Sequence, residues 1–100
     1  MARPSVELHP DAIAEARAAY LWYAERNPVA GDAFIAALDQ AVDQILDRPE
    51  RWPLYEHATR KYPLRRFPYS VIYRVTASGV QIIAVAHGRR RPGYWRSRRF

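Results

Sequence analysis

The residues best suited to chemistry lie near the end of the chain, in the stretch HGRRRPGYW at residues 87–95. A histidine titrates near neutral pH and can act as a general acid or base, while arginines bind phosphate oxygens. A Pro-Gly pair and two aromatic residues follow the arginines. The stretch is therefore a candidate for an RNA-cleaving centre, for a charged surface that binds a partner, or for a solvated tail.

The charge of the chain is divided unequally between its two halves. Residues 1–50 contain four arginines and nine acidic residues, whereas residues 51–100 contain twelve Lys or Arg residues and one acidic residue, Glu56. The halves carry −5 and +11, which gives the net charge of +6. Such an asymmetry within one small chain predicts a face that binds phosphates or carboxylates.

The composition predicts one folded domain over residues 1–100, because 100 residues with 49% hydrophobic content can bury a single core. The sequence contains no cysteine, so disulfides and thiolate metal sites are excluded, and we expect neither a metal nor a cofactor. No segment approaches the ~20 apolar residues of a membrane span. The first residues lack the apolar region of a signal peptide, so we expect a cytoplasmic protein without membrane contact.

The first half has the periodicity of a strand followed by two helices. SVELH at residues 5–9 alternates and predicts a short strand with Val6 and Leu8 on its apolar side. Helices are predicted over 10–26 and 28–46, separated by Asn27-Pro28, which predicts an antiparallel hairpin. Their apolar positions, expected to face the core, are Ile13, Ala16, Tyr20, Tyr23, Phe34, Leu38, Ala41, Val42 and Ile45.

The second half changes to the alternating period of strands. Residues 48–57 are expected to form a loop with Trp52 and Leu54 against the core. Strands are predicted over 59–67, as an edge or kinked strand because of Pro63, and over 69–75 and 80–87, joined by a hairpin turn at 76–79. The order β-α-α-β-β-β predicts an α+β fold, in which the helical hairpin packs on a small antiparallel sheet.

Three stretches carry a resemblance to a known family. They are YLWYAERNPVAGDAFIAALDQAVDQILDRPERWP in the hairpin, YPLRRFPYSVIYRV in the second half, and VQIIAVAHGRRRPGYW at its end. The chain resembles the RelE/ParE superfamily of toxins from bacterial type II toxin–antitoxin operons, from about Val6 to Trp95. The superfamily contains two activities, since RelE-like members cleave mRNA on the ribosome and ParE-like members poison DNA gyrase.

The RelE-like alternative implies particular catalytic residues. Metal-free RNA cleavage needs a base, an acid and cations for the charged phosphorane. The resemblance matches Arg65 and Arg89 to the family's arginines, with Tyr94 or Trp95 in the aromatic position and His87 as a possible acid or base. RelE-like enzymes use lysines or an acid from the region after the hairpin. There this chain offers only Arg48, Arg51, Glu50 and Glu56, and Lys61 lies later in the sequence. The base role would therefore fall to Glu56 or His87.

Purely structural roles are open for several of the same residues. His87 at a strand end is a candidate for a hydrogen-bonded structural residue. Arg65 and Arg66 are candidates for ion pairs with the hairpin's acids, such as Asp39 or Asp43. Near the C-terminus we expect a solvated basic tail that contains Arg96, Arg98 and Arg99.

The favoured interpretation is a ParE-like toxin, because the hairpin is long and no substantial helix is expected after the last strand. It implies a surface that binds the target or an antitoxin, built from Lys61, Arg65, Arg66, Arg89, Arg90, Arg91, Tyr94 and Trp95. The implied partners are DNA gyrase, or alternatively the ribosome and mRNA, and a small acidic antitoxin that folds on binding to form a hetero-oligomer. A third alternative is a non-toxic RNA-binding or adaptor domain, with arginines interleaved among aromatic residues.

Overall fold

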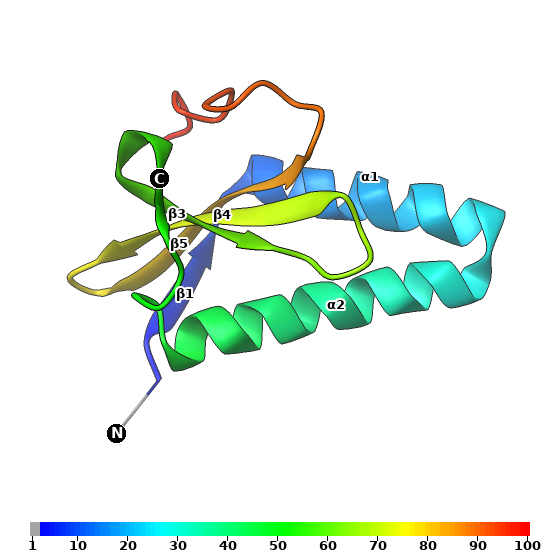
Figure 1. The fold of residues 1–100 in the computed structure, drawn as a ribbon, viewed down its shortest axis with the longest axis horizontal. Helices are drawn as coiled ribbons and strands as arrows, with labels where there is room; N and C mark the ends of the chain where they lie inside the picture. Colours follow the sequence, from blue (N-terminus) through cyan, green and yellow to red (C-terminus); the bar gives the residue numbers. More distant parts are fainter. Residues whose placement is uncertain (1–2) are drawn as a thin grey trace.

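Two helices and a five-stranded sheet make up the part of the chain that the computed structural model describes, residues 3–100 (Figure 1). In chain order the elements are β1 (Ser5–Leu8), α1 (Pro10–Arg26), α2 (Pro28–Asp47), β2 (Leu54–Tyr55), the short 3-10 helix η1 (Glu56–Ala58), β3 (Thr59–Pro63), β4 (Tyr69–Thr76) and β5 (Gly79–His87). The predicted α+β class and helical hairpin are confirmed. Strand β2 is an addition to the predicted order, inside a stretch expected to be a loop.

The helical hairpin turns at a single residue, Asn27. Its backbone amide donates to the Tyr23 carbonyl at 2.9 Å and ends α1, while its side-chain oxygen accepts from the Val29 amide at 3.0 Å and caps α2. Pro28 occupies the first helical position, where its missing N–H leaves no bond unmade. A Cβ on Gly31 would lie 2.7 Å from the Ala24 Cβ, so the tip of the hairpin requires a glycine there.

The sheet has the strand order β1-β5-β4-β3-β2. Strand β1 pairs with β5 in parallel, so the sheet, which was expected to be antiparallel, has one parallel pair at this edge. The chain between these two parallel strands contains the helical hairpin and strands β2, β3 and β4. The other strand pairs are antiparallel, and β4 and β5 form the predicted hairpin through residues 76–79.

Strand β3 is shorter than predicted and ends at Pro63. Proline has no N–H to donate to a neighbouring strand, which favours the end of the pairing at this point. The Leu64 amide instead donates to the Tyr69 carbonyl at 2.9 Å and closes a loop over residues 64–68. Arg65 and Arg66 therefore lie in a loop rather than on a strand.

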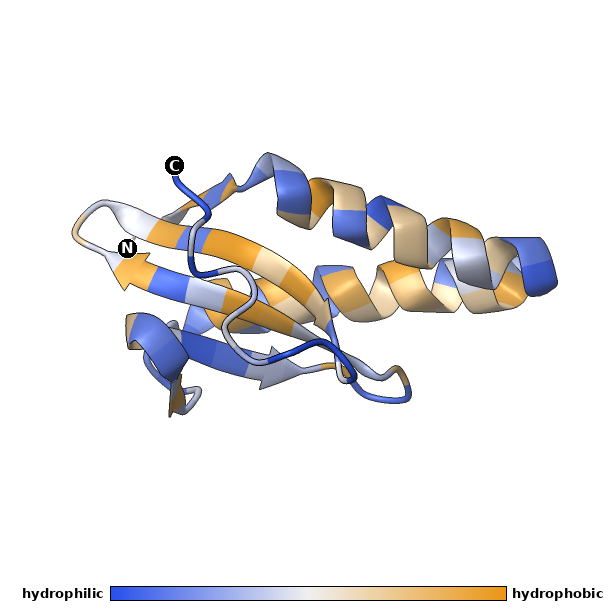
Figure 2. Ribbon diagram, turned by 90° about the horizontal axis from the view of Figure 1, so that it is seen from above, coloured by the Kyte–Doolittle hydropathy of each residue, from blue (hydrophilic) through white to orange (hydrophobic). Residues whose placement is uncertain are grey.

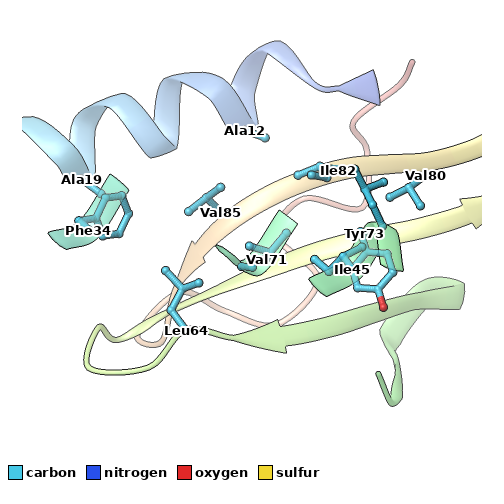
Figure 3. Packing of buried hydrophobic residues seen from close by; sticks show 12 residues of the cluster. Ala12, Ala19, Phe34, Ile45, Leu64, Val71, Tyr73, Val80, Ile82 and Val85 are labelled. Atoms are coloured by element: carbon cyan, nitrogen blue, oxygen red, sulfur yellow. The ribbon is translucent and has the colours of Figure 1, made fainter. Parts of the chain in front are cut away.

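The main core lies between the helical hairpin and one face of the sheet (Figure 3). Figure 3 shows its side chains converging from helices and strands, among them Phe34, Ile45, Leu64, Val71, Tyr73, Ile82 and Val85. The sheet-facing positions of α1 are small, with Ala12 and Ala19 almost fully buried. Small residues allow this helix to approach the strands closely.

Two predictions about burial are wrong. Ile13 is 53% exposed because the neighbouring Ala12 faces the sheet in its place. Leu54 is 72% exposed on the two-residue edge strand β2, although Trp52 is half-buried against Tyr62 with ring centroids 4.3 Å apart. All four residues of β1 are exposed, because this strand forms the other edge of the sheet.

The opposite face of the sheet is covered by the C-terminal segment, residues 88–100. Figure 1 shows this segment in orange and red on the far side of the strands from α2, and Figure 2 shows the same hydrophilic coil crossing the apolar strands. Trp95 is 1% exposed and packs with Ile72, Ile83 and Ala84 in a second buried cluster. A register shift at Ile72 and Tyr73 brings the adjacent residues Ile83 and Ala84 into the same cluster.

Candidate functional site

Two loops rich in arginine meet at the end of the sheet where β4 begins and β5 ends. The Gly88 amide donates to the Pro68 carbonyl at 2.7 Å and joins the loop of residues 64–68 to the segment after β5. Five exposed arginines lie on these loops and are called the basic end below: Arg65, Arg66, Arg89, Arg90 and Arg91. The structure therefore brings together two sets of predicted site residues that are distant in the sequence.

No carboxylate lies within ion-pair distance of the basic end in residues 3–100, whose ion pairs all use other cations. The predicted pairing of Arg65 or Arg66 with Asp39 or Asp43 is not formed. Asp43 instead binds Arg3, with an Nη2–Oδ1 distance of 3.3 Å. The charge of the basic end is consequently available to an external anion.

Arg66 has a left-handed backbone conformation with φ of 69°. Residues other than glycine rarely adopt it, and such positions cost about 1–3 kcal/mol each. The Leu64–Tyr69 bond closes the loop around Arg66, which is how this conformation is maintained. Strain of this kind is frequent at functional loops, which makes Arg66 a candidate for a functional residue of the basic end.

A hollow of about 130 Å³ opens beside the basic end, on the face of the sheet that carries the C-terminal segment. Its lining includes Lys61, His87, Arg90, Arg91 and Tyr94, and no Asp or Glu. The Lys61 ammonium lies 4.8 Å from the centre of the Tyr55 ring, and the Arg90 guanidinium lies 3.9 Å from the centre of the Tyr94 ring. Cation–π contacts therefore hold two of these cations in place.

Glu15 of α1 is the centre of a hydrogen-bond network that fastens the C-terminal segment, called the Glu15 network below. Arg98 donates to both carboxylate oxygens at 2.8 and 2.9 Å, and the Tyr94 hydroxyl donates at 2.6 Å. Strand β1 pairs with β5 only as far as Ile82, so the Val85 amide lies beyond it and donates to Glu15 at 3.0 Å. One carboxylate therefore binds helix, sheet and C-terminal segment together.

The environment of this network shifts the pKa of each ionisable member. Burial raises the pKa of Glu15, but hydrogen bonds from Arg98, Tyr94 and Val85 outweigh burial and leave that pKa below its ordinary value of 4.5. Burial and the bond to Glu15 raise the pKa of Tyr94. The bond to Glu15 raises the pKa of Arg98 despite its burial. Tyr94 is thus a poorer acid than a free tyrosine.

The predictions for the end of the chain need two corrections. Trp95 was expected on the binding surface, but it lies in the second buried cluster because the segment must cover Ile72 and Ile83. Arg98 is not part of a solvated tail, since its side chain is 13% exposed and paired with Glu15. Arg96 and Arg99 are exposed, as predicted.

His87 has a structural role in the turn that follows β5. Its Nδ1 accepts a hydrogen bond from the Arg89 amide at 3.0 Å, and its ring lies edge-on to Tyr69 with centroids 5.0 Å apart. These contacts occupy one ring nitrogen and fix the orientation of the imidazole. They agree with the interpretation of His87 as a hydrogen-bonded residue at a strand end.

The residues proposed for RNA cleavage are only partly assembled. His87 and Tyr94 line the hollow, but Arg65 and Arg89 do not belong to its lining. Glu56 is exposed on η1 and lies outside the lining as well. The hollow can therefore bind an anion through its cations, and it holds no carboxylate to act as a base.

Glu15 was absent from the predicted site, although the sequence contains a signal for it. Residue 15 is three positions after Ala12 and four before Ala19, so it lies on the sheet-facing side of α1. A carboxylate on such a face needs a buried partner. The identity of that partner, Arg98, depends on the path of the C-terminal segment and is not readable from spacing.

The fold and the site define a small α+β protein with an unpaired basic surface at one end of its sheet. Residues 6–92 match the family described as ParE toxin of type II toxin–antitoxin system, parDE. The chain belongs to this family.

The fold agrees with a solved relative from a structure described as the chromosomal ParDE TA system from P. aeruginosa. The two chains superpose with a TM-score of 0.63 at 21% sequence identity, over 85% of this chain and 96% of that one. At this identity the likeness concerns the fold. No curated protein sequence matches the chain. In residues 3–100, no helix combines the length and the apolar character that a membrane crossing requires.

Proposed function

We propose that this ParE-family toxin stops bacterial growth by poisoning DNA gyrase and is held inactive by a cognate antitoxin. The observation that carries the proposal is the family match over residues 6–92, combined with a basic end whose neighbouring hollow has no Asp or Glu in its lining. Poisoning of an enzyme needs a shaped and charged surface rather than catalytic groups. The proposed setting is the cytoplasm, from an operon that stabilises a plasmid or chromosomal locus.

The antitoxin is proposed to be a small acidic chain that folds on binding. A groove of about 480 Å³ beside α1 offers it an apolar seat, lined by Trp22, Tyr23, Tyr69 and Val85 among others. Trp22 is 52% exposed there, and large aromatic side chains are frequent anchors of protein interfaces. Its carboxylates would pair with the positive half of the chain and speed association.

The test of the proposed function is induction of the chain alone in a bacterium, followed by assays with purified components. Growth arrest that the adjacent acidic reading frame suppresses supports the toxin–antitoxin assignment, while a harmless product contradicts it. Inhibition of supercoiling with trapped gyrase–DNA cleavage complexes supports the gyrase target. Gyrase that remains fully active at a large excess of toxin contradicts it.

The second candidate function is ribosome-dependent mRNA cleavage, which is favoured by one observation. The hollow assembles Lys61, His87, Arg90 and Arg91 around a space that can hold a phosphate. Cleavage of mRNA on stalled ribosomes would support this function, and His87→Ala should then abolish it. Cleavage that His87→Ala retains would exclude His87 from the mechanism.

A further inference from the structure

We propose that the basic end, together with Lys61, binds the phosphate backbone of duplex DNA, so that the toxin contacts nucleic acid directly. Binding itself goes beyond the proposed function and needs no gyrase. Its use in the toxin's action, where gyrase holds a DNA duplex, rests on the proposed function. Three features of this surface support the proposal: its cations form no ion pairs, the neighbouring aromatic rings are occupied, and its loops lack apolar anchors.

The surface offers six cations and no competing carboxylate. Five are the arginines of the basic end, and the sixth is Lys61 on the rim of the hollow. Glu15, which lines a groove together with Arg90, is occupied by Arg98 and Tyr94. Guanidinium groups bind phosphate oxygens through two parallel hydrogen bonds, so the five arginines of this set are suited to binding phosphates.

The aromatic residues near these cations are not free to stack on bases. Arg90 covers the Tyr94 ring, and Trp95 is buried. Tyr69 packs edge-on against His87, while Phe67 packs against Tyr23 with centroids 5.0 Å apart. Proteins that bind single strands rely on open aromatic faces, whereas contacts to a duplex backbone need only positioned donors and charge. The surface therefore fits a duplex better than a single strand.

The basic end also lacks the apolar anchors of a protein interface. The large hydrophobic side chains that are exposed in residues 3–100 lie on other segments than the two loops of the basic end: Val6, Leu8, Ile13, Leu21, Trp22, Val29, Ile35, Leu54 and Phe100. Trp22 of α1 shares a groove with Arg90, but the two loops carry no exposed large hydrophobic side chain themselves. Segments that fold on binding need apolar contacts to offset their ordering. Phosphate binding is driven by charge and by the release of counterions, and it needs no such anchors.

The test is fluorescence anisotropy of a labelled duplex of about 20 base pairs, titrated with the purified chain without gyrase at several salt concentrations. Six contacts predict a slope of log K against log salt near −5, which is a loss on the order of 1,000-fold between about 50 and 200 mM salt. Arg89→Gln with Arg91→Gln should weaken binding by about tenfold and reduce the slope by about 2. Circular dichroism verifies that each variant is folded.

The matched control is Arg48→Gln with Arg51→Gln, which removes the same charge from exposed positions that lie near Val75, at the other end of β4. It should leave the slope unchanged. Equal losses in the two variants, or no duplex binding by the folded chain at the lowest salt, would overturn the proposal. Tighter binding of a single-stranded RNA of equal length, or of poly-glutamate, would also overturn the assignment to duplex DNA. Gyrase assays are separate, so either result stands whether or not gyrase is the target.

Discussion

Arg98 and the arginines of the basic end belong to the same C-terminal half but lie in opposite surroundings. Arg98 has a side chain 13% exposed and donates to both oxygens of Glu15. Arg89 and Arg91 are exposed and have no carboxylate within ion-pair distance in the described residues. The same residue type thus stabilises the fold in one place and remains free to bind in the other.

Arg98 is paired, unlike the arginines of the basic end, because helix α1 places the Glu15 carboxylate beside it. Glu15 faces the sheet beyond the end of β1, where the Val85 amide and the Ile83 carbonyl need partners. Arg98 bonds the Ile83 carbonyl at 3.0 Å as well as Glu15, so it satisfies the sheet edge and the acid together. In residues 3–100, no acid forms an ion pair with the arginines of the basic end. The positive charge there is not neutralised by an ion pair in the described residues and can attract an external anion.

The largest effect on stability should come from removing the Trp95 side chain, which packs the C-terminal segment against the sheet. Trp95→Ala should lower the free energy of unfolding by about 4 kcal/mol, because it empties a fully buried position. Urea denaturation followed by circular dichroism measures the loss. The matched control is Trp22→Ala, at a position 52% exposed, which should cost less than about 1 kcal/mol. Similar losses for the two tryptophans would contradict the burial of Trp95.

The next effect concerns the Glu15 network. Glu15→Gln should cost about 3 kcal/mol of unfolding free energy, since it leaves the largely buried Arg98 without a counter-charge. Glu25→Gln removes an exposed charge from the same helix and should be nearly neutral. Hydrogen exchange should also show faster opening of residues 94–98 in Glu15→Gln only. Unchanged hydrogen exchange of residues 94–98 in Glu15→Gln would show that Glu15 does not hold the C-terminal segment in place.

A smaller effect should appear in the pH dependence of stability. The pKa of Glu15 is lowered in the folded state, so its contribution is present above the ordinary value of 4.5 and is lost as pH falls through the folded-state pKa. The wild-type chain should therefore lose stability on acidification, and its difference from Glu15→Gln should shrink. Unfolding curves at neutral and acidic pH measure this difference. A constant difference at every pH would exclude Glu15 as the group that titrates.

Some elements of the fold are predictable from local sequence, and others are not. The helical hairpin and strands β4 and β5 follow from local periodicity, and Asn27 marks the turn between the helices. The loop that carries Arg65 was predicted as a strand because the alternating pattern continues past Pro63. Only the missing N–H of the proline decides that the pairing stops.

The site was predictable in its charge but not in its division into paired and free arginines. Counting charges identifies the positive half, and the resemblance identifies the residues of the basic end. The burial of Trp95 and the bonding of Glu15 to the C-terminal segment both depend on the path of residues 88–100 across the sheet. That path has no periodicity, because its residues form turns rather than a helix or strand. Contacts between positions this distant in the chain are not encoded in spacing.

The smallest effect on stability should come from the basic end itself. Arg89→Gln with Arg91→Gln should change the free energy of unfolding by no more than about 0.5 kcal/mol, because both side chains are exposed and unpaired. The same variant should lose toxicity on induction if these charges hold the target. A stable chain with weakened toxicity would assign the arginines to binding alone. A stability loss as large as that of Glu15→Gln would mean that they support the fold, and the contrast between the two regions would then disappear.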